Sequence, residues 1–296
     1  MPLQRVVNYG GFKMKIYIDG KYYDKDQAKI SVFDHGLLYG DGVFEGLRIY
    51  DGKIFKLKEH LIRLYQSAKA ILLDVSLNKK EMEKAVLDAV KMNEKNNGYI
   101  RLLVTRGEGS LGIDPGKCPH SSVIIIVGDI DVYPQECYEK GIRIITSSIR
   151  RSSVESLDPR IKSLNYLNNI MAKIEAKQAG CLEAVMLNKD GMVAECTGDN
   201  IFIIKNRIAY TPLVQNGILE GITRNTVFEL LNDTNIKFCE TSLSSYDLYN
   251  ADECFLTGSA VEIIPVIMID GRVIGDGTLG FYTKKLIKNF KLKTAG

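Results

Sequence analysis

The sequence has no tryptophan, only three histidines, and six cysteines spread over 296 residues. No two cysteines form a Cys-x-x-Cys pair, so the ligand spacing of a zinc site is absent and we expect no bound metal. A signal-peptide pattern is also lacking, and scattered cysteines in such a chain are typical of reduced thiols. We therefore expect a cytoplasmic protein.

The chain also lacks a long hydrophobic run and a block of one charge. Its longest purely apolar run, Val-Ile-Ile-Ile-Val at 123–127, is far shorter than the ~20 residues needed to cross a bilayer and suits a buried strand. The net charge is only +3, and no cluster of lysines and arginines forms a basic stripe. We expect neither a membrane nor a nucleic acid as partner, whereas phosphates and carboxylates suit a mild positive charge.

The composition is that of an ordinary globular protein, with 45% hydrophobic and 25% charged residues, and the length is sufficient for two cores. Residues 1–13 show no periodic pattern, and we expect an extension without regular structure there. We assign residues 14–130 to a small N-terminal α/β domain and residues 139–296 to a larger C-terminal domain. The polar segment 131–138, which contains a Tyr-Pro pair, is the expected interdomain loop.

Hydrophobic periodicity predicts helices and strands in both halves. In the first half these are a hairpin at 15–23, helices at 58–72 and after Asn78, and strands at 99–107 and 121–130. In the second half helices are expected at 164–180 and from 222, with strands at 141–148, 182–188, 192–196, 200–205, 207–210, 236–240, 252–257 and 262–269. Without regular βαβ alternation this is an α+β (mixed α/β) fold in two lobes, not a Rossmann fold.

Lys162 lies between a loop containing Pro159 and the start of a predicted helix. A single lysine in such a place is usually a solvated surface charge. The neighbouring Leu164, Leu167 and Ile170 predict a buried face beside it, and desolvation lowers the pKa of a lysine enough to make it a nucleophile that can form a Schiff base. From these residues alone, the surface role is the stronger interpretation.

Two segments have the chemistry of an anion site. Gly221 precedes a predicted helix whose first amides, those of Ile222 and Thr223, have no partner within the helix. Arg63, on an earlier helix, has a guanidinium that can grip a phosphate in a bidentate fashion. A plain helix cap and an exposed arginine explain the same residues equally simply.

Two further segments combine small or acidic residues with strand ends. Residues 257–260, Thr-Gly-Ser-Ala, form a loop of small residues that allows backbone amides to approach a ligand or simply makes a turn. Glu195 stands at a strand end, where a carboxylate often caps a turn. Such a carboxylate can also pair with the protonated ring nitrogen of a bound cofactor.

In order along the chain, these segments resemble the fold type IV pyridoxal-phosphate enzymes, and within them the branched-chain-amino-acid aminotransferases. The resemblance runs from about residue 14 to residue 290. Seven ordered blocks are more specific than any one of them: FDHGLLYGDGVFEGLR, EHLIRL, GYIRLLVTRG, KSLNYLNN, VAECTGDNIF, LEGITR and LTGSAVEIIPV. The resemblance implies a two-lobed fold type IV architecture and transfer of an amino group from leucine, isoleucine or valine to 2-oxoglutarate.

The resemblance also implies roles for the residues around the cofactor, pyridoxal 5'-phosphate. Lys162 would bind it as a Schiff base and then move the proton of the substrate Cα. Glu195 would pair with the ring nitrogen, and Tyr166 with the phenolic oxygen. The phosphate would be held by Arg63, by the amides of Ile222 and Thr223, and by Ser259, which stands where the family commonly has threonine.

Substrate binding is implied by a second group of residues. Tyr99 and the amides of Ser259 and Ala260 would bind the α-carboxylate, and Arg101 would accommodate the second carboxylate of glutamate. An apolar side-chain pocket would be shaped by Tyr39, Phe44 and Tyr133. Leu111 and Ile113 match loop residues that reach in from a neighbouring subunit, which implies a homodimer or a dimer-based hexamer.

Other members of the same fold group are the rival interpretations. D-amino-acid transaminase shares three of the blocks, but its carboxylate trap uses an arginine and a histidine in the loop that here reads EGSLGIDPG. Aminodeoxychorismate lyase ranks third, and an (R)-selective amine transaminase normally departs from the Tyr-Ile-Arg sequence found here. A non-catalytic binding protein would have no need for the lysine, glutamate, tyrosine and arginine together.

Overall fold

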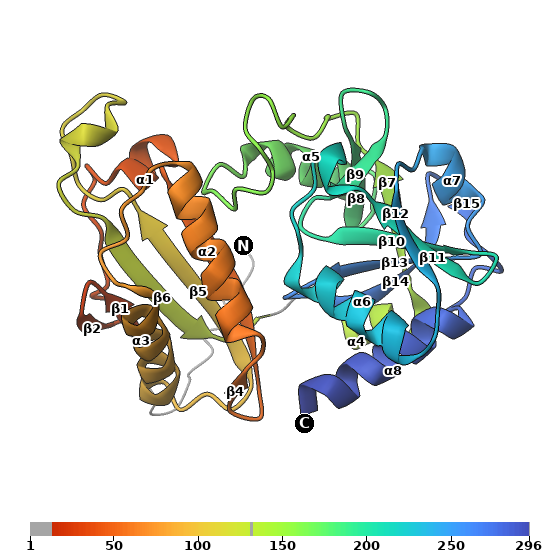
Figure 1. The fold of residues 1–296 in the computed structure, drawn as a ribbon, viewed down its shortest axis with the longest axis horizontal. Helices are drawn as coiled ribbons and strands as arrows, with labels where there is room; N and C mark the ends of the chain where they lie inside the picture. The colour runs from red at the N-terminus through yellow and green to blue at the C-terminus, as the bar shows by residue number, and fades with distance from the viewer. Residues whose placement is uncertain (1–13, 131–132, 296) are drawn as a thin grey trace, which may run out of the picture.

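The computed structural model describes residues 14–130 and 133–295, so the extension expected over residues 1–13 lies outside the described residues. Figure 1 shows two lobes side by side, each built on its own sheet. The mixed α/β class and the two-lobed arrangement predicted from the sequence are confirmed. No helix in the described part of the chain is long and apolar enough to cross a membrane.

The N-terminal lobe is an antiparallel sheet of six strands with two long helices against one face (Figure 1). The strand order is β2-β1-β6-β5-β3-β4, and the core lies between this sheet and helices α2 and α3. The elements are β1 (Lys15–Ile18), β2 (Lys21–Asp24), α1 (His35–Tyr39), β3 (Gly42–Tyr50), β4 (Lys53–Ile54), α2 (Leu57–Ala70), α3 (Lys79–Met92), β5 (Gly98–Thr105) and β6 (Ser122–Gly128).

The local sequence explains where these elements begin. Asn78 accepts hydrogen bonds from the amides of Lys80 and Glu81, and the Glu81 side chain accepts one from the Asn78 amide, so a complete capping box starts α3. Asp19 and Gly20 both have positive φ, as the tight turn between β1 and β2 requires. The structure thus confirms the hairpin and the helix after Asn78 that the sequence predicts.

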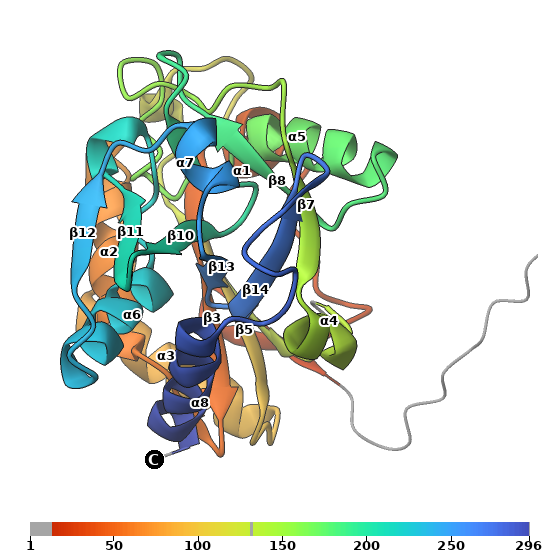
Figure 2. The same cartoon turned by 90° about the vertical axis from the view of Figure 1, so that its right-hand side faces the viewer.

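The C-terminal lobe is a mixed sheet of nine strands, in the order β12-β11-β10-β13-β14-β7-β8-β9, with β15 beside β14. Helices α6 and α8 lie side by side against it in Figures 1 and 2, over a core in which Phe202 and Phe255 stack at 5.0 Å. The elements are α4 (Gln135–Lys140), β7 (Ile142–Thr146), α5 (Leu167–Gln178), β8 (Glu183–Leu187), β9 (Val193–Cys196), β10 (Asn200–Lys205), β11 (Ile208–Pro212), α6 (Ile222–Asp233), β12 (Phe238–Thr241), α7 (Ser245–Tyr249), β13 (Glu253–Gly258), β14 (Glu262–Ile269), β15 (Arg272–Val273) and α8 (Phe281–Ala295).

Some elements were not predicted. The segment 131–138, expected to be a loop, contains the start of α4, which is too short to show a helical period. Strand β3 was missed because almost every residue in it is buried, so its sequence does not alternate, and two glycines interrupt it. The helices α1 and α8 were also not assigned.

One backbone contact between the lobes fixes the place of Lys162. The Phe44 amide donates to the Lys162 carbonyl, and the Leu164 amide donates to the Gly42 carbonyl, both at 2.9 Å. Strand β4 covers β3 only at Ile49 and Tyr50, so the opposite end of this edge is free to pair with the loop. Lys162 therefore lies on the N-terminal sheet although it belongs to the C-terminal half of the chain.

Candidate active site between the lobes

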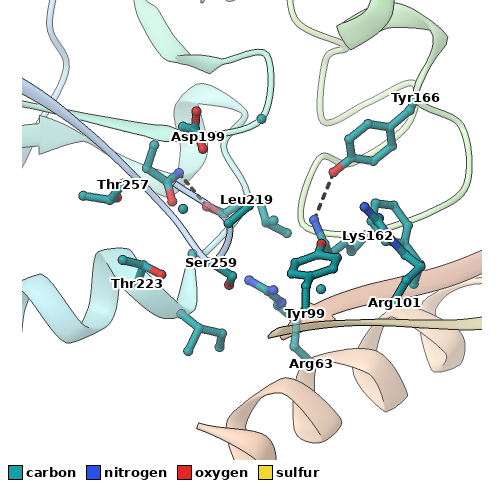
Figure 3. A pocket seen from close by; sticks show the side chains of 18 of the residues that line it. Arg63, Tyr99, Arg101, Lys162, Tyr166, Asp199, Leu219, Thr223, Thr257 and Ser259 are labelled. Carbon is teal, nitrogen blue, oxygen red and sulfur yellow. Dashed lines mark hydrogen bonds between the residues drawn. The ribbon is translucent and has the colours of Figure 1, made fainter. Parts of the chain in front are cut away.

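A cavity of about 540 Å³ opens between the two lobes and is lined by both (Figure 3). On the N-terminal side, alternate residues of β3 and β5 face it, because successive side chains of a strand point to opposite faces. It brings together most of the residues predicted from the sequence: Phe44, Arg63, Tyr99, Arg101, Lys162, Tyr166, Glu195, Ile222, Thr223, Ser259 and Ala260. Residues from distant parts of the chain thus share one site.

Lys162 projects into this cavity from the pairing with β3. Its Nζ lies 3.0 Å from the Tyr166 hydroxyl and 4.5 Å from the centre of the Phe44 ring. The Ser67 hydroxyl accepts a hydrogen bond from the Lys162 amide at 3.1 Å, which fixes the backbone from the side of α2. The buried face expected from Leu167 and Ile170 was wrong, since these are 68% and 50% exposed; the aromatic rings of Phe44 and Tyr166 enclose the amine instead.

Arg63 enters the cavity from α2 and is held by a carboxylate that the sequence did not reveal as part of the site. Its Nε and one terminal nitrogen each lie 2.8 Å from an oxygen of Glu45, whose side chain is completely buried. His60 Nδ1 lies 2.7 Å from the same carboxylate, and the other terminal nitrogen of Arg63 donates to the Glu220 carbonyl at 2.7 Å. Burial by itself would raise the pKa of the Glu45 carboxyl, but Arg63 and the contact with His60 outweigh it and hold this pKa well below its usual range.

Three of the five N–H groups of Arg63 are used in these contacts, and two remain for a ligand. Next to them, α6 begins at Ile222 without a side-chain cap. The amides of Ile222 and Thr223 donate to no carbonyl among the described residues, so they face the cavity with the positive end of the helix dipole. The arginine and the helix terminus together make a cup for a dianion.

Glu195 occupies another part of the cavity wall and is buried. Arg151 lies 2.9 Å from one of its oxygens, and the Asn200 side chain and the Leu219 amide donate to the other at 3.1 and 3.0 Å. Burial raises the pKa of the Glu195 carboxyl, and the arginine and the Leu219 amide act in the opposite direction. These donors fix the orientation of the carboxylate beside the cavity.

The turn between β13 and β14 closes the cavity on the C-terminal side. The amides of Ser259 and Ala260 donate to no carbonyl in the described chain, and Arg48 of β3 grips the Ala260 carbonyl at 3.0 Å. The Thr257 hydroxyl is buried at the cavity wall and has no hydrogen-bond partner among the described residues. A buried hydroxyl without a partner is costly, so this wall is built to receive a polar ligand.

Tyr99 and Arg101 project from β5 on the same face. The phenol of Tyr99 lies over Gly46, and the Arg101 guanidinium lies 4.7 Å from the centre of the Phe44 ring and 5.4 Å from that of Tyr99. Burial raises the pKa of Tyr99, so its hydroxyl keeps its proton and can donate a hydrogen bond.

Four predicted residues do not line the cavity. Tyr39 lies on α1, where its hydroxyl accepts from the Gly112 amide at 2.9 Å, and Tyr133 packs on the core of the C-terminal lobe with its hydroxyl near Glu183. Each belongs to another hydrogen-bonded cluster in the single chain, and their assignment to the side-chain pocket stays a prediction. Leu111 and Ile113 are 65% and 85% exposed, as residues expected to reach a neighbouring subunit have to be.

Several residues of the site were not predicted from the sequence: Glu45, Gly46, His60, Arg151 and Asn200. For Thr257 the loop was predicted, but the part played by its hydroxyl was not. The only available signal was a glutamate in the otherwise apolar run Val-Phe-Glu-Gly-Leu at 43–47, since a buried charge requires a partner. The complete cavity offers a cup for a dianion, a fixed carboxylate and an amine among aromatic rings. A planar ring that carries a phosphate, a basic nitrogen and a carbonyl group reactive toward amines fits these groups.

Comparisons with known proteins agree with this geometry. The sequence profile of the family described as "Amino-transferase class IV" matches residues 42–269. A protein of Methanocaldococcus jannaschii, provisionally assigned as a branched-chain-amino-acid aminotransferase, is 52% identical over 94% of this chain and 96% of its own length. A D-alanine aminotransferase from Bacillus licheniformis is 35% identical over 92% of the chain and 94% of its own length.

Solved structures of branched-chain amino acid aminotransferases superimpose on most of the chain. The enzyme of Escherichia coli does so with a TM-score of 0.92 and 33% identity, and the match covers 94% of this chain and 94% of that one. Another, solved with pyridoxamine 5'-phosphate, also has a TM-score of 0.92, with 36% identity over 96% of this chain and 95% of its own. The similarity therefore extends over both lobes and includes the cavity between them.

Proposed function

This chain belongs to the class IV aminotransferases, and from that membership we propose how its residues carry out the transamination of branched-chain L-amino acids. The reaction transfers the amino group of leucine, isoleucine or valine to 2-oxoglutarate and yields a branched-chain 2-oxo acid and L-glutamate. Pyridoxal 5'-phosphate, the cofactor of this family, supplies a carbonyl group that takes up the amine and a ring that delocalises the electron pair left at Cα. The observation that carries the proposal is the Lys162 amine facing this cavity.

Lys162 is the catalytic residue. Its Nζ lies between the rings of Phe44 and Tyr166. From this position the amine can hold the cofactor covalently, and when the substrate has displaced it the free amine can move a proton at the substrate Cα. Tyr166, 3.0 Å away, binds the phenolic oxygen of the cofactor. A base kept near this hydroxyl is already oriented toward the reacting atoms, so little reorganisation is needed.

The phosphate and the ring nitrogen of the cofactor are bound at different parts of the cavity. The phosphate is bound by Arg63, by the amides of Ile222 and Thr223, and by Ser259. Glu195 pairs with the ring nitrogen. An ionised carboxylate at the ring nitrogen favours the protonated ring, which is the stronger electron acceptor. The unpaired Thr257 hydroxyl adds a polar group on the same wall.

The substrate binds between the aromatic residues and the turn of β13 and β14. The Tyr99 hydroxyl and the amides of Ser259 and Ala260 bind its α-carboxylate, and Phe44 contacts its aliphatic side chain. Arg101 lies stacked on two rings, where it leaves room for an apolar chain yet can pair with the second carboxylate of 2-oxoglutarate. One pocket can thus serve both half-reactions.

We further propose that the protein works as a homo-oligomer, a dimer or a dimer-based hexamer. The support is a set of exposed apolar side chains on the loop at 108–116 and on one face of α5: Leu111, Ile113, Leu167, Ile170, Met171 and Ile174. The division into domains 14–130 and 139–296, and a cytoplasmic location, which fits six free cysteines, are kept as proposals of the same kind.

The D-amino-acid alternative is not favoured, although one similar relative is a D-alanine aminotransferase. The loop at 108–116 has neither of the side chains that would trap a carboxylate in that enzyme. The test is a single-turnover panel of L- and D-amino acids, read by cofactor absorbance at equal concentrations. We expect fast reaction with L-leucine, L-isoleucine and L-valine; a faster reaction with D-alanine than with any of these would overturn the assignment.

A further inference from the structure

Asp199 is a buried carboxyl on the cavity wall that the reaction described above does not use. It stands just before β10 and is 7% exposed, and no hydrogen-bond donor of the described residues contacts its side chain. Figure 3 shows it on the side of Thr257 and Leu219, across the cavity from Lys162. A buried carboxyl without a partner is costly, which sets Asp199 apart from other acidic groups of the site.

Burial is the main cause that disfavours the ionised form of Asp199, and the charge of Glu183 on β8 is the next. Glu195 on β9 acts in the same direction, and Lys173 on α5 and Lys162 act against it. The other titratable groups that face Asp199 are Tyr133, Tyr138 of α4 and Cys196 of β9. Glu183 forms an ion pair with Lys173 at 2.9 Å and accepts a hydrogen bond from the Thr197 amide at 3.0 Å. The negative charge of Glu183 is therefore stabilised by direct partners, whereas that of Asp199 is not. Burial, and then the charge of Glu183, raise the pKa of Asp199 to about 8.

The Asp199 carboxyl lies close to the β13–β14 turn, so its charge can affect what this turn binds. A Cβ on Gly258 would overlap Asp199 Oδ1, so the carboxyl lies directly against the backbone that leads into Ser259 and Ala260. The amides of those two residues are the free donors assigned above to the substrate carboxylate. A negative charge at Asp199 would stand behind these donors and repel the carboxylate that they bind, with little solvent to screen it.

We propose that Asp199 controls the affinity of the site for carboxylates: its carboxyl must be uncharged for the turn Gly258–Ala260 to bind the carboxylate of a substrate. The inference rests on the proposed function in one respect, the use of this turn for carboxylate binding. It adds that carboxylate affinity falls in alkaline solution because of one identified side chain.

The test measures binding rather than turnover. The holoenzyme is titrated with 4-methylvaleric acid, an aliphatic carboxylate without an amino group, by calorimetry between pH 6.5 and 9.5. Three proteins are compared: wild type, Asp199→Asn, and the matched control Asp190→Asn, which changes an exposed aspartate in the β8–β9 turn. Asp199→Ser provides a second uncharged variant in case the asparagine protein does not fold.

We expect the dissociation constant of the wild type and of the control to rise above pH 8, toward about tenfold for each further pH unit. In the uncharged variants this part of the rise should be missing. Because the other groups of the site are the same in all the proteins, the decisive quantity is the ratio of the wild-type constant to that of Asp199→Asn. A ratio that stays the same across the pH range overturns the proposal, as does a ratio that falls with pH.

The outcome is separable from that of the proposed function. If the wild type shows no cofactor absorbance or no transamination of L-leucine at pH 7, the proposed function fails before the titration is made. If the wild type is active and the ratio is flat, only the role of Asp199 is lost.

Discussion

The phenol of Tyr99 occupies the space that a side chain at Gly46 would take. Gly46 lies opposite Arg101 in the β3–β5 ladder, and Tyr99 is the diagonal neighbour on the same face. A Cβ on Gly46 would overlap the Tyr99 hydroxyl, so the ring keeps this position only because position 46 has no side chain. The glycine therefore determines where the Tyr99 hydroxyl, the proposed donor for the substrate carboxylate, lies.

We predict that Gly46→Ala displaces the Tyr99 hydroxyl and raises the KM for L-leucine. Loss of a hydrogen bond to a charged group costs about 1.5–3 kcal/mol, which corresponds to roughly a ten- to hundredfold increase. Steady-state kinetics measure it, and cofactor affinity should change little. In a Tyr99→Phe background the same alanine should add less, since the hydroxyl is already gone; full additivity of the two changes would contradict this explanation.

For Lys162→Ala we predict a folded protein that no longer catalyses multiple turnovers. Reduction with borohydride should attach the cofactor covalently to the wild type and not to the variant, because Lys162 is the only lysine of the described residues that lines the cavity. Lys177→Ala, at an exposed position of α5, is the matched control and should behave as wild type. Sustained turnover by Lys162→Ala would refute the assigned role.

The lysine, the phosphate cup and the carboxylate beside the cavity were predicted from the resemblance, since each of their residues stands inside one of the ordered sequence blocks. The side chains that hold them were not predictable, because their partners are remote. Glu45 grips Arg63 from 18 positions away, and Arg151 reaches Glu195 across 44 positions. The assignment of Tyr133 stays a prediction: its aromatic character suits a substrate pocket, and in the single chain its hydroxyl lies near Glu183 in the C-terminal lobe.

Glu45→Gln should weaken cofactor binding indirectly, because Glu45 contacts Arg63 and not the cavity. The variant leaves Arg63 buried with an incomplete partner, a change of about 3 kcal/mol in similar buried pairs, and we expect the dissociation constant of pyridoxal 5'-phosphate to rise at least about tenfold. Absorbance titration of the apoenzyme measures it. The control is Glu59→Gln, which changes an exposed glutamate of α2, the helix that carries Arg63, and should leave the constant unchanged.

The same carboxylate predicts a pH effect on stability. Because the pKa of Glu45 in the folded protein lies below its ordinary value, its contribution is fully present above the unfolded pKa of about 4.5 and is lost as the pH falls below it. The free energy of unfolding of the wild type should therefore decline more steeply below pH 5 than that of Glu45→Gln. Parallel declines in urea denaturation would show that the ion pair contributes nothing.

Glu195→Gln should slow the half-reaction far more than it weakens phosphate binding. The amide keeps the shape of the side chain but not the charge that favours a protonated ring, while Arg63 and the α6 terminus stay intact. Stopped-flow absorbance with L-leucine gives the rate, and titration gives the affinity. Equal rates in the two proteins would eliminate the electrostatic argument, and a loss confined to affinity would make Glu195 structural.

Arg101→Ala should separate the two half-reactions. Arg101 lies over the rings of Phe44 and Tyr99. An aliphatic substrate can contact only the apolar surface of these side chains, whereas the second carboxylate of 2-oxoglutarate also needs the positive charge of Arg101. We expect the KM for 2-oxoglutarate to rise by roughly ten- to hundredfold and that for L-leucine by only a few fold. Arg101→Lys keeps the charge and loses the planar fork, so it should fall between the two. An equal loss for both substrates would mean that Arg101 only holds the aromatic rings in place, and the site would then need another group to accept glutamate.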